Sequence, residues 1–238
     1  MNIIPISIIL VLGYLLGSIS IARLVTRIVR PDLELDSLQV TDKKTGGTFT
    51  LNTVGATTVS MMLGPRIGGM IGILDILKGV LPTLAVRFLF PDQKYFMAMG
   101  VAIVIGHIWP LYYKFRGGGG LSPALGALLV LDPLGIVICV LLAMLIGIFL
   151  LQEVSFVLLG GPLLFIFWTA IVSRNWSHII FALLINLILI IAVIPDISKH
   201  RKAVKAGEAD LASSIPMAKM MKEMMARIGL KKRGKKSS

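Results

Sequence analysis

The residues with the clearest chemical potential lie in the stretch GHIWPLYYKFRGGGGLSPALG, residues 106–126. Two basic side chains, Lys114 and Arg116, precede a run of four glycines, and an apolar segment typical of a helix follows the run. The run consists of Gly117, Gly118, Gly119 and Gly120. Consecutive glycines let backbone N–H groups converge without obstruction by a Cβ, and a helix N-terminus adds partial positive charge. The pattern predicts a phosphate-binding loop, with a flexible re-entrant turn as the alternative.

His107 is the second residue of the same stretch and precedes the glycines in the chain. Its imidazole is suited to donate a hydrogen bond or to accept a proton from a substrate hydroxyl. The alternative is a packed or interfacial histidine with no chemical role. We predict His107 as the catalytic side chain.

Two further polar segments contain glycine-linked groups that suit an anion. They read TFTLNTVGATTVSMMLGPRIGG, residues 48–69, and SKHRKAVKAGEA, residues 198–209. If both segments face the same side of a membrane as the glycine run, the three polar clusters converge on one anionic substrate.

A charged pair lies inside an otherwise apolar segment. In ILDILKG, residues 73–79, Asp75 and Lys78 are three residues apart and therefore one helical turn from each other. Charges inside a membrane are costly unless they are paired or face a polar cavity. The pair predicts either structural self-pairing or a contact between Lys78 and substrate.

The composition sets the class of protein that must position these groups. Of the 238 residues, 56% are hydrophobic, and the mean hydropathy is +0.88. Apolar runs near bilayer-spanning length recur along the chain, which excludes an ordinary soluble domain. The runs are Ile3–Val29, Ile67–Phe90, Phe96–Tyr113, Pro123–Leu131, Leu134–Leu151, Val154–Val172 and Trp176–Ile194. The sequence predicts an all-α integral membrane protein with about seven transmembrane helices, the fourth being short or a half-helix.

Basic residues set the expected orientation. After Ile194 the chain carries 12 Lys and Arg against 4 Asp and Glu, which biases this tail to the cytoplasm. Seven spans then place the N-terminus outside, and residues 30–66, residues 114–120 and the Gln152-Glu153 turn on the cytoplasmic side. We therefore expect a multi-pass cell-membrane protein whose active site faces the cytoplasm. Basic residues at membrane borders explain the net charge of +12, so we expect no nucleic-acid partner.

The chain divides into a polytopic domain, residues 1–195, and a basic cytoplasmic tail, residues 196–238. Within the tail, apolar residues at helical spacing predict an amphipathic helix at about 216–229, lying on the inner leaflet or forming an oligomer contact. The loop 30–66 contains LQVTDKKTGGTFTL, whose alternation around a Lys-Thr-Gly-Gly turn suggests a small hairpin. The single cysteine, Cys139, lies in an apolar run and predicts packing.

Several of these motifs, in this order, resemble the acyl-phosphate-dependent glycerol-3-phosphate acyltransferases (PlsY). The resemblance covers nearly the whole chain. Its motifs are GYLLGSISIARL at 13–24, VGATTVSMMLG at 54–64, LDILKG at 74–79, GHIWPLYYKFRGGGG at 106–120 and HRKAVKAGE at 200–208. It implies a seven-helix enzyme that transfers a fatty acyl group from acyl phosphate to glycerol 3-phosphate, giving lysophosphatidate for phospholipid synthesis.

The resemblance also implies the partners and the site. The partners are acyl phosphate, glycerol 3-phosphate and membrane lipids, with no cofactor and no metal. Together with the groups named above, the substrate-binding residues that it suggests are Asn52, Gly55, Thr57, Lys78, Lys114, Arg116, Gly117, Gly118, Gly119, Gly120, His200, Arg201 and Glu208.

The sequence departs from the family pattern where the family carries a serine, two asparagines, an arginine, a lysine and a threonine. Those positions hold Leu51, Thr53, Thr58, Met61, Gly119 and Pro123. The missing groups are mainly those expected to hold the phosphate of glycerol 3-phosphate. The alternative function is therefore a non-catalytic or altered-acceptor homologue that acts as a lipid-binding or regulatory membrane protein.

Overall fold

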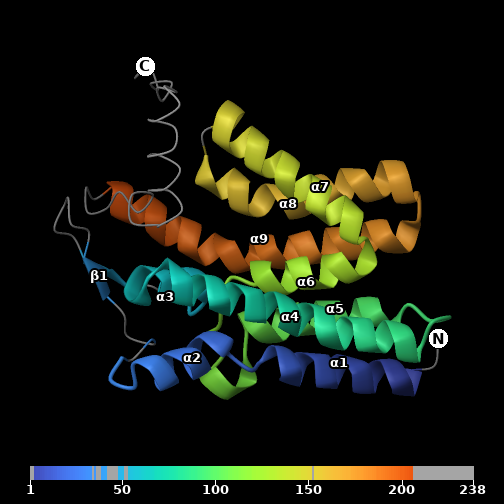
Figure 1. The fold of residues 1–238 in the computed structure, drawn as a ribbon, viewed down its shortest axis with the longest axis horizontal. Coiled ribbons are helices and arrows are strands. Elements are labelled where there is room, and N and C mark those ends of the chain that lie inside the picture. The colour runs from blue at the N-terminus through green and yellow to red at the C-terminus, as the bar shows by residue number, and fades with distance from the viewer. Residues whose placement is uncertain are drawn as a thin grey trace.

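Long apolar helices dominate the computed structural model, which describes residues 3–33, 35, 39–41, 48–50, 53–151 and 153–205 (Figure 1). The α-helices are α1 (Ile3–Gly17), α2 (Ile21–Val29), α3 (Ala56–Leu63), α4 (Pro65–Leu89), α5 (Tyr95–Ile108), α6 (Leu121–Leu131), α7 (Pro133–Leu145), α8 (Val154–Trp168) and α9 (Trp176–Lys205). Shorter helical elements are the 3-10 turn η2 (Leu111–Tyr113) and the π-helical segments η3 (Ile146–Leu151) and η4 (Thr169–Ser173).

Six segments of the described chain are long and apolar enough to cross a membrane, and α6 is a shorter apolar helix. The six are Ile4–Val29, Pro65–Leu89, Tyr95–Tyr113, Pro133–Leu151, Ser155–Ser173 and Trp176–Ile194. These bounds confirm the predicted class and the short fourth span. The predicted division into residues 1–195 and 196–238 stays a prediction, and the expected tail helix at 216–229 lies outside the described residues.

The helix α5 forms the centre of the bundle. In its spanning segment 61% of the most apolar stretch is buried, against 28% in each of the other five spans of the described chain. Its residues Ile103 and Val104 are fully buried and share a core with Leu128 of α6 and Phe165 of α8. The end of α5 that carries His107 is therefore held from several sides.

Glycines allow the closest helix crossings. A side chain at Gly17 of α1 would place its Cβ 2.3 Å from the carbonyl oxygen of Ile103, and one at Gly106 would come within 2.2 Å of the Tyr14 carbonyl. Without a hydrophobic driving force between helices in lipid, such backbone contact is a main source of packing. The glycines of GYLLG and GHI thus bring α1 against α5.

The same device joins α4 to α6. A Cβ at Gly79 would lie 2.3 Å from the Pro123 carbonyl oxygen, and one at Gly126 would lie 2.3 Å from the Ile76 carbonyl oxygen. The α4 segment that carries Asp75 and Lys78 is therefore fixed against the start of α6, next to the glycine run.

The first span is broken after Gly17. Ser20 caps α2, since its Oγ accepts a hydrogen bond from Arg23 N at 3.4 Å, and the helix restarts at Ile21. The break leaves two carbonyls, those of Gly17 and Ile19, without a backbone N–H donor among the described residues. Lys78 Nζ donates to both, at 3.1 and 2.9 Å.

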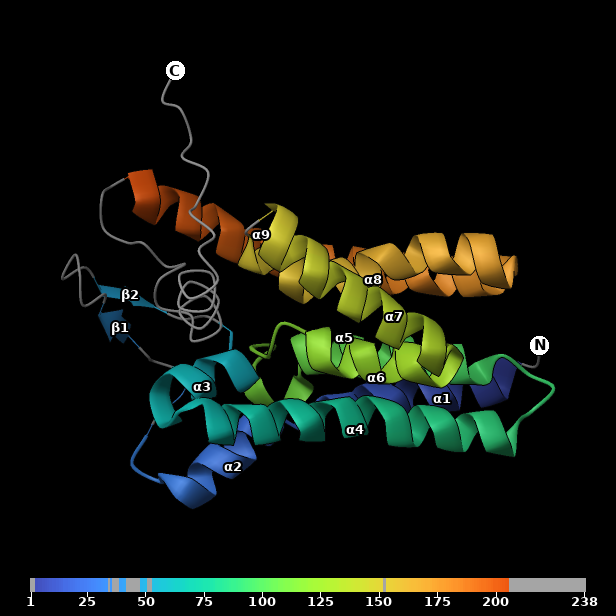
Figure 2. The same cartoon turned by 45° about the horizontal axis from the view of Figure 1, so that its top comes forward.

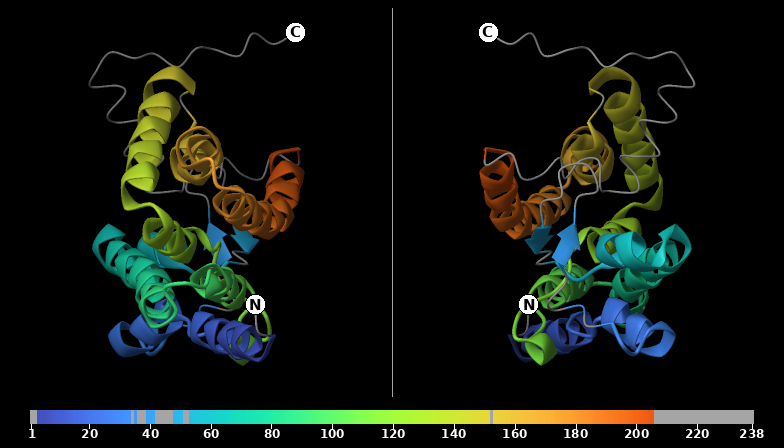
Figure 3. Two further views of the ribbon diagram at one scale, coloured as in Figure 1. Left: turned by 90° about the vertical axis from the view of Figure 1, so that its right-hand side faces the viewer. Right: turned by 90° about the vertical axis from the view of Figure 1, so that its left-hand side faces the viewer.

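The remaining spans form a second row of helices, which packs over a first layer. Figure 2 shows α7, α8 and α9 on one side of a layer that contains α1, α4 and α5. Seen end-on in Figure 3, α6 lies between this layer and the second row, and it contacts α7, α8 and α9. Free Cys139 is buried in α7, which confirms the packing role predicted for it.

A short antiparallel hairpin precedes α3. Strands β1 (Gln39–Thr41) and β2 (Thr48–Thr50) pair with Gln39 opposite Thr50, where the sequence suggested a hairpin. Figure 1 places β1, α3 and the C-terminal end of α9 at the end of the bundle opposite the N-terminus. Two predicted polar segments therefore lie at one end of the molecule.

Candidate active site

The glycine loop is fastened to two elements that are distant in the sequence. Gly118 N donates a hydrogen bond to the carbonyl oxygen of His107 at 3.1 Å, and Val54 N donates to the Gly117 carbonyl oxygen at 2.8 Å. The first bond ties the loop to the end of α5, and the second ties it to the residues before α3. Gly117 and Gly118 are buried as a result, so the loop is an ordered part of the fold.

The imidazole of His107 faces Gly118. A side chain at Gly118 would place its Cβ 2.3 Å from His107 Nε2, and one at Gly117 would lie 2.0 Å from the His107 carbonyl oxygen. Only glycine fits at these two positions with the histidine in place. The prediction that His107 lies beside the glycine run thus agrees with the geometry.

Two helix N-termini meet at the same point. Gly55 caps α3, and a Cβ there would lie 3.6 Å from the Cα of Gly118. Gly120 caps α6 with a φ of 79°, a left-handed conformation that favours glycine. Each helix start carries partial positive charge and unpaired N–H groups, so the pair favours an anion between them.

The donors that remain for an anion lie after Gly118. The Gly118 N–H is already bonded to His107, whereas the N–H groups of residues 119–122 have no acceptor in the described part of the chain. Gly119 is exposed, and a Cβ added there would meet no atom within 4 Å. The predicted anion site therefore centres on Gly119, Gly120 and the first turn of α6.

Three ionisable side chains lie buried behind the loop. Lys78 Nζ is 3.0 Å from His107 Nδ1 and 3.3 Å from Asp75 Oδ1, and the latter oxygen is 3.5 Å from His107 Nδ1. Asp75 is 2% exposed and His107 8%. The three side chains thus form one cluster, which includes the ion pair between Asp75 and Lys78, one of the two alternatives that the sequence left open. Contact of Lys78 with substrate stays a prediction, and its amine already has protein acceptors.

Other predicted site residues lie on the surface near the loop. Thr57 is exposed in the first turn of α3, and Lys114 and Arg116 are exposed just before the glycines. Lys114 and Phe115 adopt positive φ angles of 51° and 60°, which turn the chain from η2 into the loop. Lys114 and Arg116 therefore lie on the surface next to the loop in the chain and are not part of its buried portion.

The remaining predicted residues are placed only in part. Asn52 and Glu208 lie outside the described residues. His200 and Arg201 belong to α9, and their side chains lie outside the description. Leu189 of the same helix approaches Gly120, and His200 follows it by about 16 Å of helix at 1.5 Å per residue. The contribution of these residues to the site stays a prediction.

The first helix also braces the site, which the sequence reasoning did not foresee. Tyr14 donates its hydroxyl proton to the Trp109 carbonyl at 2.9 Å, and Ser18 Oγ accepts from Leu111 N at 3.2 Å. Arg23 lies over the ring of Tyr113, 4.4 Å from its centroid. The signal in the sequence was the GSIS break, whose small polar residues interrupt an apolar span.

Three of the departures from the family pattern have a local explanation. Thr58 Oγ1 donates to the Thr53 carbonyl, so two positions that differ from the pattern bond to each other at the start of α3. Pro123 is buried where α6 touches Gly79 of α4. These replacements preserve the helix starts but add no cation to the site.

The arrangement suits the binding of an anionic substrate and a reaction at a substrate hydroxyl oxygen. It combines backbone donors at two helix starts, an imidazole and nearby surface cations. Among the described residues, no group of three or more His, Cys, Asp and Glu side chains is placed to hold a metal ion.

Comparison with known proteins gives a consistent result. The family model described as glycerol-3-phosphate acyltransferase matches residues 7–205. The glycerol-3-phosphate acyltransferase of Geotalea daltonii is 32% identical over 202 residues, which cover 83% of this chain and 92% of that relative. The enzyme of the same name from Myxococcus xanthus is 41% identical over 128 residues, covering 53% of this chain and 60% of the relative.

Solved structures agree with this assignment. The crystal structure of PlsY, an integral membrane glycerol 3-phosphate acyltransferase, in its glycerol 3-phosphate form superposes with a TM-score of 0.67. The sequences are 25% identical, and the match covers 86% of this chain and 94% of that one. The lysophosphatidic acid form gives a TM-score of 0.66. With the family model spanning most of the chain, these findings show that the protein belongs to the glycerol-3-phosphate acyltransferase family.

Proposed function

We propose that this chain is a membrane acyltransferase that transfers a fatty acyl group from acyl phosphate to the 1-hydroxyl of glycerol 3-phosphate. The product is lysophosphatidate, which feeds phospholipid synthesis. The names of the relatives and the ligands of the two PlsY structures support the acceptor and the product. The acyl-phosphate donor comes from the family resemblance.

One observation carries the proposal: the start of α3, the start of α6 and His107 all meet at Gly118. A phosphate group carries up to two negative charges and several acceptor oxygens, so it matches converging N–H donors. An acyl phosphate and glycerol 3-phosphate each contain such a group. The site therefore suits both substrates by the same chemistry.

The reaction needs little from the protein because the donor is already activated. The hydroxyl oxygen attacks the carbonyl carbon, a new C–O bond forms, and the bond from that carbon to the phosphate oxygen breaks. Inorganic phosphate leaves, and the proton of the hydroxyl group ends on that phosphate, so that the atoms and charges of reactants and products balance. Positioning and stabilisation of the developing oxyanion supply the catalysis.

The orientation in the cell membrane is part of the proposal. Strand β1, helix α3 and the C-terminal end of α9 lie at one end of the bundle (Figure 1), and α3 is one of the two helices whose N-termini adjoin the site. The distribution of Lys and Arg supports a cytoplasmic site and an external N-terminus. The basic tail would then lie at the inner leaflet, where its predicted amphipathic helix binds lipid.

An acyl-transfer assay tests the proposal. Purified protein in detergent is given radiolabelled acyl phosphate with glycerol 3-phosphate, glycerol or another phosphorylated alcohol, and the lipid products are separated. We expect lysophosphatidate only with glycerol 3-phosphate. Transfer to another acceptor alone would support the altered-acceptor alternative, which the absence of a cation at Gly119 and Met61 favours. No transfer to any acceptor would contradict the enzyme assignment.

A further inference from the structure

We propose that Lys78 and Asp75 act as a positioning pair that fixes His107 with its ring proton on Nε2, so that His107 donates a hydrogen bond at the glycine loop. The identity of the acceptor, a substrate oxygen, rests on the proposed function. The position of the proton rests on the contacts of the described residues. The inference decides between the two roles that the sequence left open for this histidine.

The contacts of Lys78 assign the role of Nδ1. Its ammonium group carries three N–H donors and no acceptor. Nζ makes hydrogen-bond contacts with three protein acceptors, namely Gly17 O at 3.1 Å, Ile19 O at 2.9 Å and His107 Nδ1 at 3.0 Å, while Asp75 Oδ1 lies farther away, at 3.3 Å, as an ion-pair partner without a hydrogen bond. The three donors therefore match three acceptors, and Nδ1 is one of them.

The position of Asp75 agrees with this assignment. Its Oδ1 lies 3.3 Å from Lys78 Nζ and 3.5 Å from His107 Nδ1, but no hydrogen bond reaches this oxygen from the described residues. A proton on Nδ1 would point an N–H at Asp75 while leaving the ammonium 3.0 Å from a second donor. Asp75 is therefore the counter-charge of Lys78, and the proton stays off Nδ1.

The remaining ring proton then belongs to Nε2, which faces the loop. The Cβ position of Gly118 lies 2.3 Å from Nε2, so a side chain there would overlap the ring and glycine avoids the overlap. The N–H groups of residues 119–122, which lack acceptors among the described residues, belong to the same loop and helix start. An oxygen bound there receives donors from the backbone and from His107. The acceptor of the hydroxyl proton is a group other than His107.

Nitrogen NMR of the resting protein tests the assignment without any turnover. The chain has three histidines, so ¹⁵N-histidine labelling gives three pairs of ring signals, and His178→Gln and His200→Gln identify those of His107. We expect the His107 pair to show an unprotonated Nδ1 and a protonated Nε2. A protonated Nδ1 in the wild-type spectrum would overturn the proposal, whatever the variants do.

The variant Lys78→Met adds a directional test. Without the ammonium, the Asp75 carboxylate is the acceptor nearest to Nδ1, so the ring proton should move to Nδ1 and leave Nε2 unprotonated. The value of kcat should fall by about 10²-fold, the usual loss for one oriented donor, while the KM for glycerol 3-phosphate changes less than about twofold. An unchanged tautomer in the folded variant would contradict the role of Lys78.

Two substitutions of His107 distinguish a hydrogen-bond donor from a general base. The amide nitrogen of Gln takes the place of the histidine Nε2, whereas that of Asn takes the place of Nδ1, and neither amide accepts a proton at neutral pH. His107→Gln should therefore keep a kcat about tenfold or more above that of His107→Asn. Equal and complete loss in both variants would show that a base is required. If the wild-type protein transfers no acyl group at all, the proposed function fails while the NMR result still decides the position of the proton.

Discussion

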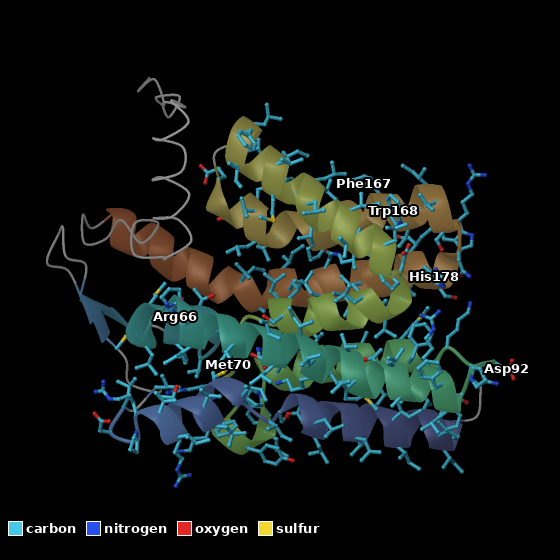
Figure 4. All side chains as sticks on the ribbon, viewed as in Figure 1. Arg66, Met70, Asp92, Phe167, Trp168 and His178 are labelled. Carbon is cyan, nitrogen blue, oxygen red and sulfur yellow. The ribbon has the colours of Figure 1, made fainter. Side chains whose placement is uncertain are left out.

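The two ends of the helix bundle contain similar polar residues with opposite surroundings. At the end far from the site, Asp132 caps α7 by accepting from Gly135 N at 2.9 Å and also accepts from Trp168 Nε1 at 2.8 Å. In the same region His178 Nδ1 lies 2.6 Å from Ser173 Oγ. Figure 4 shows Trp168 and His178 at this end and Arg66 at the other.

The site end also has an aspartate, a lysine and a histidine that contact one another. Here, however, backbone N–H donors beside them remain without an acceptor in the described chain. There His107 faces a glycine, and the adjoining N–H groups of residues 119–122 find no acceptor in the described chain. At the far end, the polar groups named above bond to one another. Residue types alone therefore do not make this site; backbone donors beside a glycine do.

The largest effect is expected from a side chain placed at Gly118. In Gly118→Val the new Cβ would overlap His107 Nε2, so the ring, the loop or both must move. Because misplacement of reacting groups by about 1 Å costs about 10²-fold in rate, we expect kcat/KM for acyl transfer to fall by at least about 10²-fold. The control is Gly69→Val, since Gly69 is exposed and a Cβ there meets no atom within 4 Å. Similar activity in both variants would show that the loop has a structural role only and does not bind substrate.

The second test replaces His107 and His178 with alanine in two separate variants. His107→Ala should lower kcat by about 10²-fold because it removes the donor at the loop. His178→Ala should change kcat less than about threefold, because this histidine contacts Ser173 at the opposite end. Activity is measured per folded molecule after size-exclusion chromatography. Wild-type turnover in His107→Ala would reduce that residue to packing.

The third test adds charge to the site. Gly119→Lys places a cation where the family carries lysine and where the structure leaves room for a side chain. If glycerol 3-phosphate is the acceptor, its KM should fall by about tenfold, in line with one hydrogen bond to a charged group. The KM for an uncharged acceptor serves as the reference. A uniform change for all acceptors would count against phosphate binding at this position.

The smallest effect is expected at the far end. Asp132→Ala removes the cap of α7 and the partner of Trp168 Nε1, so the unfolding free energy should fall by about 1 kcal/mol. Thermal unfolding in detergent measures this, and the kcat of the folded fraction should stay unchanged. A large loss of kcat with normal thermal stability would mean that the two ends are coupled.

The sequence predicted the membrane spans because long apolar runs have few structural alternatives. It also predicted that His107 and the glycines lie together, since the two are neighbours in the chain. Contacts between segments that are distant in the sequence could not be predicted in this way. Nothing in the local pattern indicated that Lys78 would reach the carbonyls of Gly17 and Ile19, because that contact depends on how a broken first span crosses the others.

The sequence also did not predict which backbone groups of the loop form hydrogen bonds. Four glycines suggested four convergent donors, yet Gly118 N–H bonds to the end of α5 and the Gly117 carbonyl accepts from Val54 N. Which backbone groups remain free depends on tertiary contacts, and the sequence contains no direct signal for them. The same holds for Arg23, whose stacking on Tyr113 joins α2 to η2.

The contacts of Lys78 also bear on how the protein is made. The span α4 enters the bilayer with Asp75 and Lys78 one turn apart, so the two charges offset each other during insertion. The carbonyls that Lys78 binds belong to a span already inserted, whereas His107 belongs to the span that follows. The buried cluster therefore closes only when α5 arrives, which links correct insertion of the first three spans to a working site.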